Sequence, residues 1–231
     1  MPVYNEGANI ATVLRGIAAE VRARPLEVLI IYDFDEDDTL PVVRMLAAEL
    51  PFVKPIKNPL GRGVLNAVKA GLAAATAPYI VVMMADGSDR VSDVDPMLRL
   101  AREGADLVAA SRYMRGGAQV GGPRLKRLMS RAAGLSLHWL AGIPVHDPTS
   151  NFKLYSRRLL ESIPIESQAG FELALELTVK AHRLGLTLSE VPTVWRDRTA
   201  GQSRFDLRRW LPHYLRWYWA GFARRLRLPV R

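Results

Sequence analysis

Apolar residues in the first third of the chain alternate between two periods. They recur at helical spacing from Ile10 to Val21, and the next apolar run, at 27–32, has the length of a strand. The same alternation continues and predicts helices at 39–50 and 64–75 and strands at 51–56 and 79–84. Strands that alternate with helices form parallel βαβ units. We therefore expect an α/β fold with a doubly wound, mostly parallel sheet and helices on both faces.

Polar residues follow the ends of the predicted strands. The strand at 79–84 is followed by Asp86-Gly87-Ser88-Asp89, and the strand at 27–32 is followed by an acidic run at 33–38. Ligands of open α/β sheets bind outside the carboxyl ends of the strands, so these segments and residues 2–6 should converge on one crevice. Aspartate, glycine and serine also form ordinary turns. Three such segments together favour a divalent cation that bridges carboxylates to an anionic diphosphate.

The composition excludes several kinds of site. The chain has 231 residues, of which 49% are hydrophobic, enough for a large core. It has no cysteine, which excludes disulfides, zinc–thiolate sites and thiol nucleophiles, and its four histidines lack the spacing of a helical metal site. The formal charge of +9 indicates an anionic partner: nucleic acid, a phosphorylated metabolite or an acidic membrane surface.

The C-terminal segment, at 206–231, concentrates arginine, tryptophan and tyrosine. Aromatic rings and guanidinium groups suit the headgroup region of an anionic membrane, so we expect an amphipathic helical tail at a membrane interface. A terminal helix packed on the core is the alternative. No recognised nucleic-acid motif accompanies the segment, and we expect no nucleic-acid partner. The chain shows no signal peptide and no apolar stretch long enough to span a bilayer, which predicts a cytoplasmic, soluble or peripheral protein.

An ordered set of motifs runs along the chain. The motifs are Pro2-Val3-Tyr4-Asn5-Glu6, the Asp33 cluster, Asn58 with Gly61-Arg62-Gly63, Ala85-Asp86, Ala110-Ser111-Arg112-Tyr113, Asp147-Pro148-Thr149-Ser150-Asn151-Phe152-Lys153-Leu154-Tyr155, and Val191-Pro192 followed by Asp197-Arg198, Gly201 and Ser203. The set resembles family 2 glycosyltransferases of the GT-A fold, in particular dolichol-phosphate mannose synthases and related polyprenyl-phosphate glycosyltransferases. The resemblance covers residues 1–205, which we expect to form the catalytic domain that precedes the tail.

The resemblance implies a role for each matching residue. Asp86 would hold the metal on the donor diphosphate, and Arg112 and Arg198 would lie around the reacting phosphates. The residues expected to bind the nucleotide are Pro2, Tyr4, Glu6, Asp33, Asp35 and Arg62. The residues expected to bind the acceptor phosphate are Lys126, Arg127 and Ser203.

Two positions depart from the family pattern. Met84 stands where the family has the first aspartate of its Asp-x-Asp motif, and a thioether is a poor ligand for Mg²⁺. We expect Asp86, Ser88 and Asp89 to bind Mg²⁺ or Mn²⁺ instead, and a metal-independent enzyme is the alternative. The family also has an apolar first strand, whereas Met1 directly precedes Pro2 here, so we expect an N-terminally shortened sequence.

The resemblance predicts an inverting glycosyltransferase that moves a sugar from a nucleotide-sugar to a polyprenyl or dolichyl phosphate on the cytoplasmic face of a membrane. A phosphate acceptor is already ionised at neutral pH, because its second pKa is about 6, and needs no strong base. A carbohydrate hydroxyl would need one, with Asp89 or Asp147 as candidates. Transfer to such a hydroxyl, a non-catalytic binding protein and a nucleotidyltransferase remain alternatives. The residues expected to act in catalysis are Asp86, Asp89, Arg112, Asp147 and Arg198.

Overall fold

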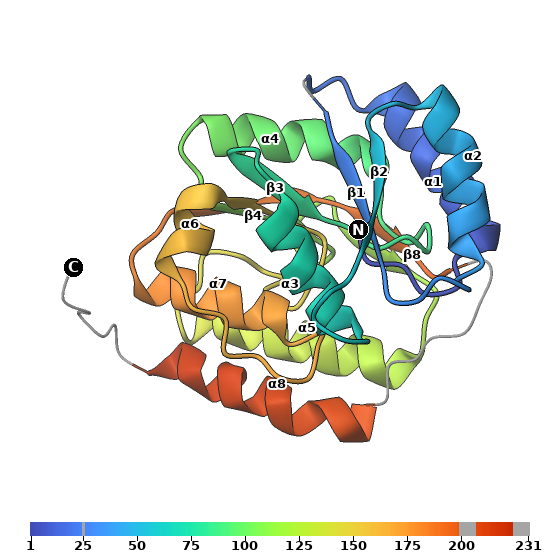
Figure 1. Cartoon of the computed structure of the whole chain (residues 1–231). Coiled ribbons are helices and arrows are strands. Elements are labelled where there is room, and N and C mark those ends of the chain that lie inside the picture. The colour runs from blue at the N-terminus through green and yellow to red at the C-terminus, as the bar shows by residue number, and fades with distance from the viewer. Residues whose placement is uncertain (25, 199–206, 224–231) are drawn as a thin grey trace.

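A computed structural model describes residues 1–24, 26–198 and 207–223 of the chain (Figure 1). Helices and strands alternate through the first half, as the apolar periodicity predicts. The elements, in chain order, are α1 (Gly7–Glu20), β1 (Val28–Tyr32), α2 (Thr39–Glu49), β2 (Val53–Lys57), α3 (Val64–Ala74), β3 (Tyr79–Val82), the short 3₁₀ helix η1 (Val91–Asp93), α4 (Val94–Arg102), β4 (Leu107–Ser111), β5 (Ala118–Val120), α5 (Arg124–Trp139), β6 (Lys153–Ser156), α6 (Arg157–Ser162), α7 (Leu173–Arg183), β7 (Leu188–Pro192), β8 (Val194–Arg196) and α8 (Leu207–Phe222).

The strands pair in three groups. A four-stranded sheet has the order β3-β6-β4-β7, and β1-β2 and β5-β8 form two-stranded pairs. The pairs β1-β2, β4-β7 and β5-β8 are parallel, which confirms the predicted α/β architecture, whereas β6 runs antiparallel to both β3 and β4. The sequence did not predict this reversal, because the apolar pattern of a short strand carries no direction.

Residues 1–3 lie beside β1. The amide of Ile31 donates to the carbonyl of Met1 at 2.9 Å, and the amide of Val3 donates to the carbonyl of Ile31 at 3.0 Å. This parallel bridge places Pro2 and the residues after it at the carboxyl end of β1. The N-terminal segment therefore enters the crevice where the sequence predicts it.

Two apolar cores cover the two faces of the strands. The first contains buried side chains of α1, α2 and α4, and the second contains those of α3, α5, α6, α7 and α8. Figure 1 shows α4 on one side of the sheet and α7, α5 and α8 on the other, with α8 outermost. Helices on both faces of the sheet are thus confirmed.

The C-terminal segment forms the helix α8, which packs on the core along one face. Trp217 is buried, the Nζ of Lys180 lies 4.9 Å from the centroid of its ring, and Arg216 forms an ion pair with Glu166 at 2.6 Å. Trp219 remains 65% exposed on the other side. The predicted amphipathic helix is confirmed, and it is docked on the core. Within the described ranges, no helix is long and apolar enough to cross a membrane.

Candidate active site

A cavity of about 1350 Å³ opens at the carboxyl ends of β1, β3 and β4. It extends from there to α5 and α8. The predicted site residues that line it are Pro2, Tyr4, Glu6, Asp33, Arg62, Asp86, Ser88, Asp89, Arg112, Lys126, Arg127 and Arg198. Asp35 and Asp147 are not among its lining residues, and Ser203 lies outside the described part of the chain. The fold thus brings together most of the residues that the sequence selects.

An aromatic and cationic wall forms one end of the cavity. The rings of Tyr4 and Phe34 meet edge to face with centroids 5.3 Å apart. The guanidinium carbon of Arg62 lies 4.9 Å from the centroid of the Phe34 ring. Tyr4 and Arg62 line the cavity in front of Phe34, and such a pair suits the planar, electron-rich surface of a nucleobase.

Asp33 supports the loop that carries Arg62. Its Oδ1 accepts a hydrogen bond from Nδ2 of Asn58, and its Oδ2 accepts one from the amide of Gly63, both at 2.8 Å. Gly63 has a φ of 130°, which a residue with a side chain rarely adopts. The Asp33 carboxylate therefore fixes this glycine-rich loop at the edge of the cavity.

The rest of the acidic segment at 33–38 supports the backbone. Asp37 is buried and accepts hydrogen bonds from the amide of Asn5 at 3.1 Å, and Oδ1 of Asp38 accepts one from the amide of Gly7 at 2.9 Å. Asp35 is exposed and forms an ion pair with Lys57. The expectation that this whole segment faces the crevice is therefore wrong beyond Asp33, and Asp35 does not reach the cavity.

The loop after β3 presents one edge of the Asp86 carboxylate to the cavity. Oδ1 of Asp86 accepts hydrogen bonds from the amide of Ser88 at 3.0 Å and from its hydroxyl at 2.6 Å. Gly87, with a φ of 74°, makes the left-handed turn that folds Ser88 back onto Asp86. Because Ser88 holds Oδ1, the other oxygen of Asp86 is oriented away from this turn.

Asp89 lies in the same loop and stabilises it. Its Oδ2 accepts a hydrogen bond from the amide of Met84 at 3.0 Å. Burial raises the pKa of Asp89 to about 7, and the nearby negative charge of Asp86 acts in the same direction. The Met84 backbone thus contacts the second carboxylate of the loop.

Arg198 links the two acidic parts of the cavity. Its Nη2 lies 2.8 Å from Oδ2 of Asp86, and its Nη1 lies 3.8 Å from Oε1 of Glu6. Burial raises the pKa of Glu6, whose other oxygen accepts a hydrogen bond from Asn9 at 2.7 Å. The sequence placed Arg198 near the reacting phosphates, and the structure places it on the carboxylate expected to hold the metal.

Arg112 is held by Asp147 beneath the cavity. Its Nε and Nη2 donate to the two oxygens of Asp147, at 2.6 and 3.0 Å, and Nη2 also donates to Ser130 at 3.2 Å. Asp147 has no exposed surface. Although burial alone would raise the pKa of Asp147, the charge and hydrogen bonds of Arg112 hold it below its usual value. Asp147 is therefore a partner of Arg112, and its candidacy as a general base is corrected.

We expect Asp147→Asn to destabilise the fold by about 3–5 kcal/mol, because it leaves the charge of Arg112 buried and unpaired. Urea unfolding of the variant and the parent measures the loss. Asp35→Asn removes an equally charged but exposed side chain and serves as the control, with no change in midpoint expected. An unchanged midpoint for Asp147→Asn would show that the pair adds nothing to stability.

Lys153 is a supporting residue to which the sequence analysis gave no role of its own. It is fully buried, and its Nζ donates to the carbonyls of Pro148, at 2.9 Å, and Ser150. Burial lowers the pKa of Lys153 to about 7, although the charge of Asp147 opposes the shift. Its contacts hold the loop whose Thr149 lines the cavity. A lysine directly before Leu154 and Tyr155, at the start of a short strand, was the available signal in the sequence.

The part of the cavity that α5, α7 and α8 line, its apolar half, is mainly apolar, and no sequence motif predicted it. Cationic side chains that line the cavity act on one another: burial lowers the pKa of Lys126, and the charges of Arg112 and Arg198 add to the effect. An anionic group would relieve this repulsion between cations. Apolar side chains that line this half come from α5, α7 and α8: Met129, Ala132, Ala133, Leu175, Leu211 and Leu215.

Comparison with known proteins gives a consistent set of relatives. A family model described as glycosyl transferase family 2 matches residues 1–164. Polyprenol monophosphomannose synthase of Mycolicibacterium smegmatis is 28% identical over 214 residues, which cover 89% of this chain and 79% of that protein. Dolichyl-phosphate hexose transferase of Haloferax volcanii is 31% identical over 206 residues, which cover 89% of this chain and 85% of that protein.

Solved structures share the fold. Glucosyl-3-phosphoglycerate synthase from Mycobacterium tuberculosis in complex with uridine-diphosphate aligns with a TM-score of 0.67 at 21% identity, over 96% of this chain and 78% of that one. The complex of the same enzyme with Mn²⁺, uridine-diphosphate-glucose and phosphoglyceric acid aligns with a TM-score of 0.64 at 24% identity, over 96% of this chain and 76% of that one. At this identity the likeness establishes the α/β architecture.

Proposed function

The chain belongs to glycosyl transferase family 2, and from this premise we propose that it transfers a sugar from a nucleotide-sugar to a polyprenyl phosphate. The two-part cavity carries the proposal, because a polar end and an apolar half meet at the cations Arg112, Lys126 and Arg127. A nucleotide suits the polar end, a prenyl chain suits the apolar half, and their phosphates meet at the cations. The names of the two relatives, a polyprenol monophosphomannose synthase and a dolichyl-phosphate hexose transferase, support the same assignment.

The donor occupies the polar end in this proposal. Tyr4 and Arg62 contact the base, with Pro2 and Glu6 beside the ribose, and Asp33 keeps the loop that carries Arg62 in place. This arrangement is supported by the aromatic and cationic wall, which matches a planar base. Asp35 is left out of the donor site, because it is exposed and paired with Lys57.

The residues around Asp86 fit a divalent cation that is shared with the donor diphosphate. Among the described residues, no group of three or more histidine, aspartate or glutamate side chains could hold a metal by itself. Mg²⁺ commonly binds through one or two carboxylates together with substrate phosphates and water, and Oδ2 of Asp86 already faces a cation, Arg198. We propose that Asp86 holds Mg²⁺ or Mn²⁺, with Ser88 and Asp89 completing the site directly or through water. The bound cation would stabilise the negative charge that grows on the departing diphosphate.

The reaction is a direct displacement. An oxygen of the acceptor phosphate forms a bond to the anomeric carbon, the bond from that carbon to the diphosphate breaks, and the electron pair leaves with the nucleoside diphosphate. One displacement inverts the anomeric centre. The acceptor oxygen is ionised at neutral pH, since the second pKa of a phosphate monoester is about 6, so no protein base is required. The burial of Asp147 under Arg112 supports this route, because it removes one of the two candidate bases.

Lys126 and Arg127 orient the acceptor phosphate, and the positive charge of Arg112 attracts the same phosphate. Their guanidinium and ammonium donors match phosphate oxygens. The basic, aromatic segment at 206–231 would hold the protein at the cytoplasmic face of a membrane, where anionic lipids attract arginine. The N-terminal 205 residues would then form the catalytic domain. Ser203, also expected at this phosphate, lies outside the described residues.

A pair of matched acceptors tests the proposal. We expect the purified protein, given a panel of nucleotide-sugars and Mn²⁺, to glycosylate a polyprenyl phosphate and to leave the corresponding polyprenol untouched. Only the phosphate contributes an ionised nucleophile and a partner for Lys126 and Arg127. Mass spectrometry of the extracted lipid detects the product. Transfer to polyprenol, or only to a soluble glycoside, would contradict a phosphate acceptor.

A further inference from the structure

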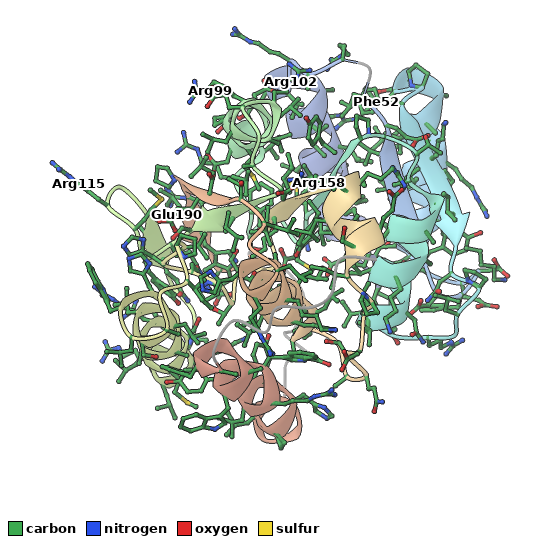
Figure 2. All side chains as sticks on the ribbon, turned by 90° about the vertical axis from the view of Figure 1, so that its left-hand side faces the viewer. Phe52, Arg99, Arg102, Arg115, Arg158 and Glu190 are labelled. Carbon is green, nitrogen blue, oxygen red and sulfur yellow. The ribbon has the colours of Figure 1, made fainter. Side chains whose placement is uncertain are left out.

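Exposed apolar side chains gather at one end of the molecule. Ten large apolar residues of the described chain are exposed, and six of them lie on α5, directly after it, or on α8. In both views α5 and α8 lie side by side at the end of the molecule that is opposite α4 (Figures 1 and 2). Arg99 and Arg102, labelled in Figure 2, mark the position of α4. The six residues are Leu125, Leu128, Trp139, Leu140, Leu215 and Trp219.

The exposed residues of α5 form a stripe along the helix. Leu125, Leu128 and Trp139 fall on one face at helical spacing, and they are 65%, 65% and 72% exposed. Arg127 and Arg131 are also exposed on this helix, beside the stripe. Apolar rings and chains flanked by arginines are typical of helices that lie at a lipid interface, because the guanidinium groups can reach headgroups while the apolar groups are buried.

The two helices form one continuous surface. The hydroxyls of Ser136 and Tyr218 lie 3.0 Å apart. A Cβ built on Gly221 would come within 2.6 Å of Cδ2 of Leu137, so the glycine permits a close approach of the helices. Leu215 and Trp219 of α8, which are 41% and 65% exposed, therefore extend the surface that α5 begins.

Charge decides which partner this surface fits. The sequence of α5 contains three arginines, one lysine and no acidic residue. That of α8 contains three arginines and no acidic residue, and one of them, Arg216, is paired with Glu166. A second copy of the chain that docked by the same surface would bring arginines against arginines, which is unfavourable. An anionic surface would be attracted, and apolar side chains interspersed with cations match a bilayer with acidic headgroups.

We propose that α5, Leu140 and α8 together form a docking face for an anionic lipid bilayer. The contact between the protein and the membrane thus involves α5 as well as the C-terminal segment. The apolar half of the cavity lies between the same helices, lined by Met129 and Ala133 of α5 and by Leu211 of α8. Where the acceptor is a polyprenyl phosphate, a point that rests on the proposed function, its chain would pass from the bilayer directly into the cavity.

Vesicle binding tests this face. The probe is vesicles of equal parts phosphatidylcholine and phosphatidylglycerol, sedimented with the full chain. We expect Leu125→Gln combined with Leu128→Gln to weaken partitioning at least about tenfold, because two exposed leucines no longer enter the interface. Trp139→Gln tests the other end of the stripe and should also weaken partitioning to the vesicles. Met45→Gln, on α2, is the control, because Met45 is 58% exposed far from this face.

Three outcomes separate this inference from the proposed function. Reduced partitioning of the α5 variants, with unchanged transfer to a water-soluble short-chain isoprenyl phosphate, supports both. Reduced partitioning with no transfer to any acceptor by the parent supports the face and contradicts the function. Partitioning of the α5 variants equal to that of the parent and of Met45→Gln overturns the docking face, whatever the activity.

Discussion

Asp86→Asn is expected to lower metal-dependent sugar transfer by at least about 10²–10³-fold. The amide keeps the shape of the side chain and the hydrogen bond to Ser88, but it loses the negative charge that would anchor a divalent cation on the donor diphosphate. Turnover is measured at saturating nucleotide-sugar over a range of Mn²⁺ concentrations, and Mn²⁺ binding is measured separately by calorimetry. Unchanged turnover and Mn²⁺ affinity would remove Asp86 from the metal site.

Two further variants sharpen this prediction. Asp35→Asn removes a carboxylate of the acidic loop that does not line the cavity, and we expect it to leave turnover unchanged. Met84→Asp places a carboxylate at a lining position two residues before Asp86, and we expect tighter Mn²⁺ binding in a folded protein. If Met84→Asp binds Mn²⁺ no more tightly than the parent, Met84 does not stand at a metal position.

Arg198→Ala is expected to reduce sugar transfer by about 10²-fold or more while nucleotide affinity changes far less. Nη2 of Arg198 lies 2.8 Å from Oδ2 of Asp86, so the guanidinium contacts the carboxylate that would hold the metal and the donor diphosphate. If Asp86 held a cation, the guanidinium of Arg198 would be close enough to pair with a phosphate of the donor, whose oxygens match its fork of donors. Arg198→Lys should rescue transfer only partly, because an ammonium keeps the charge and loses the fork.

The ion pair between Arg198 and Asp86 gives Arg198→Ala a second measurable effect, on Mn²⁺ affinity. Because Arg198 would compete with a cation for the Asp86 carboxylate, Arg198→Ala should bind Mn²⁺ in the absence of nucleotide at least as tightly as the parent does. Single-turnover transfer, nucleotide affinity and Mn²⁺ affinity are compared for the alanine and lysine variants. Equal losses of transfer and nucleotide affinity would assign Arg198 to donor binding alone, and no loss of either would remove it from the reaction.

Local patterns predicted the elements and loops of the donor side. The periodicity of the first 84 residues places α1, β1, α2, β2, α3 and β3, and the polar runs after the strands locate Asp33 and Asp86 at the cavity. These features depend on residues close together in the chain. A short-range pattern is enough for them, because parallel strands bring their carboxyl ends to one edge.

Long-range pairing is what the sequence could not supply. Arg112 and Asp147 are 35 positions apart, and no spacing rule predicts that the Asp147 carboxylate pairs with Arg112 in the folded chain. The structural use of Asp37, which binds the amide of Asn5, and the contact between Arg198 and Asp86 depend in the same way on how distant segments meet. The exposure of α5 escaped prediction for a related reason, since an amphipathic helix does not reveal which of its faces the core will cover.

The most direct test of the central claim is a single-turnover experiment that measures both products. The protein is mixed with its nucleotide-sugar and a polyprenyl phosphate, with Mn²⁺ or with a chelator, and the released nucleoside diphosphate and the glycosylated lipid phosphate are quantified together. The account predicts equal amounts of the two products with Mn²⁺ and neither with the chelator. Nucleoside diphosphate released without glycosylated lipid phosphate would contradict it.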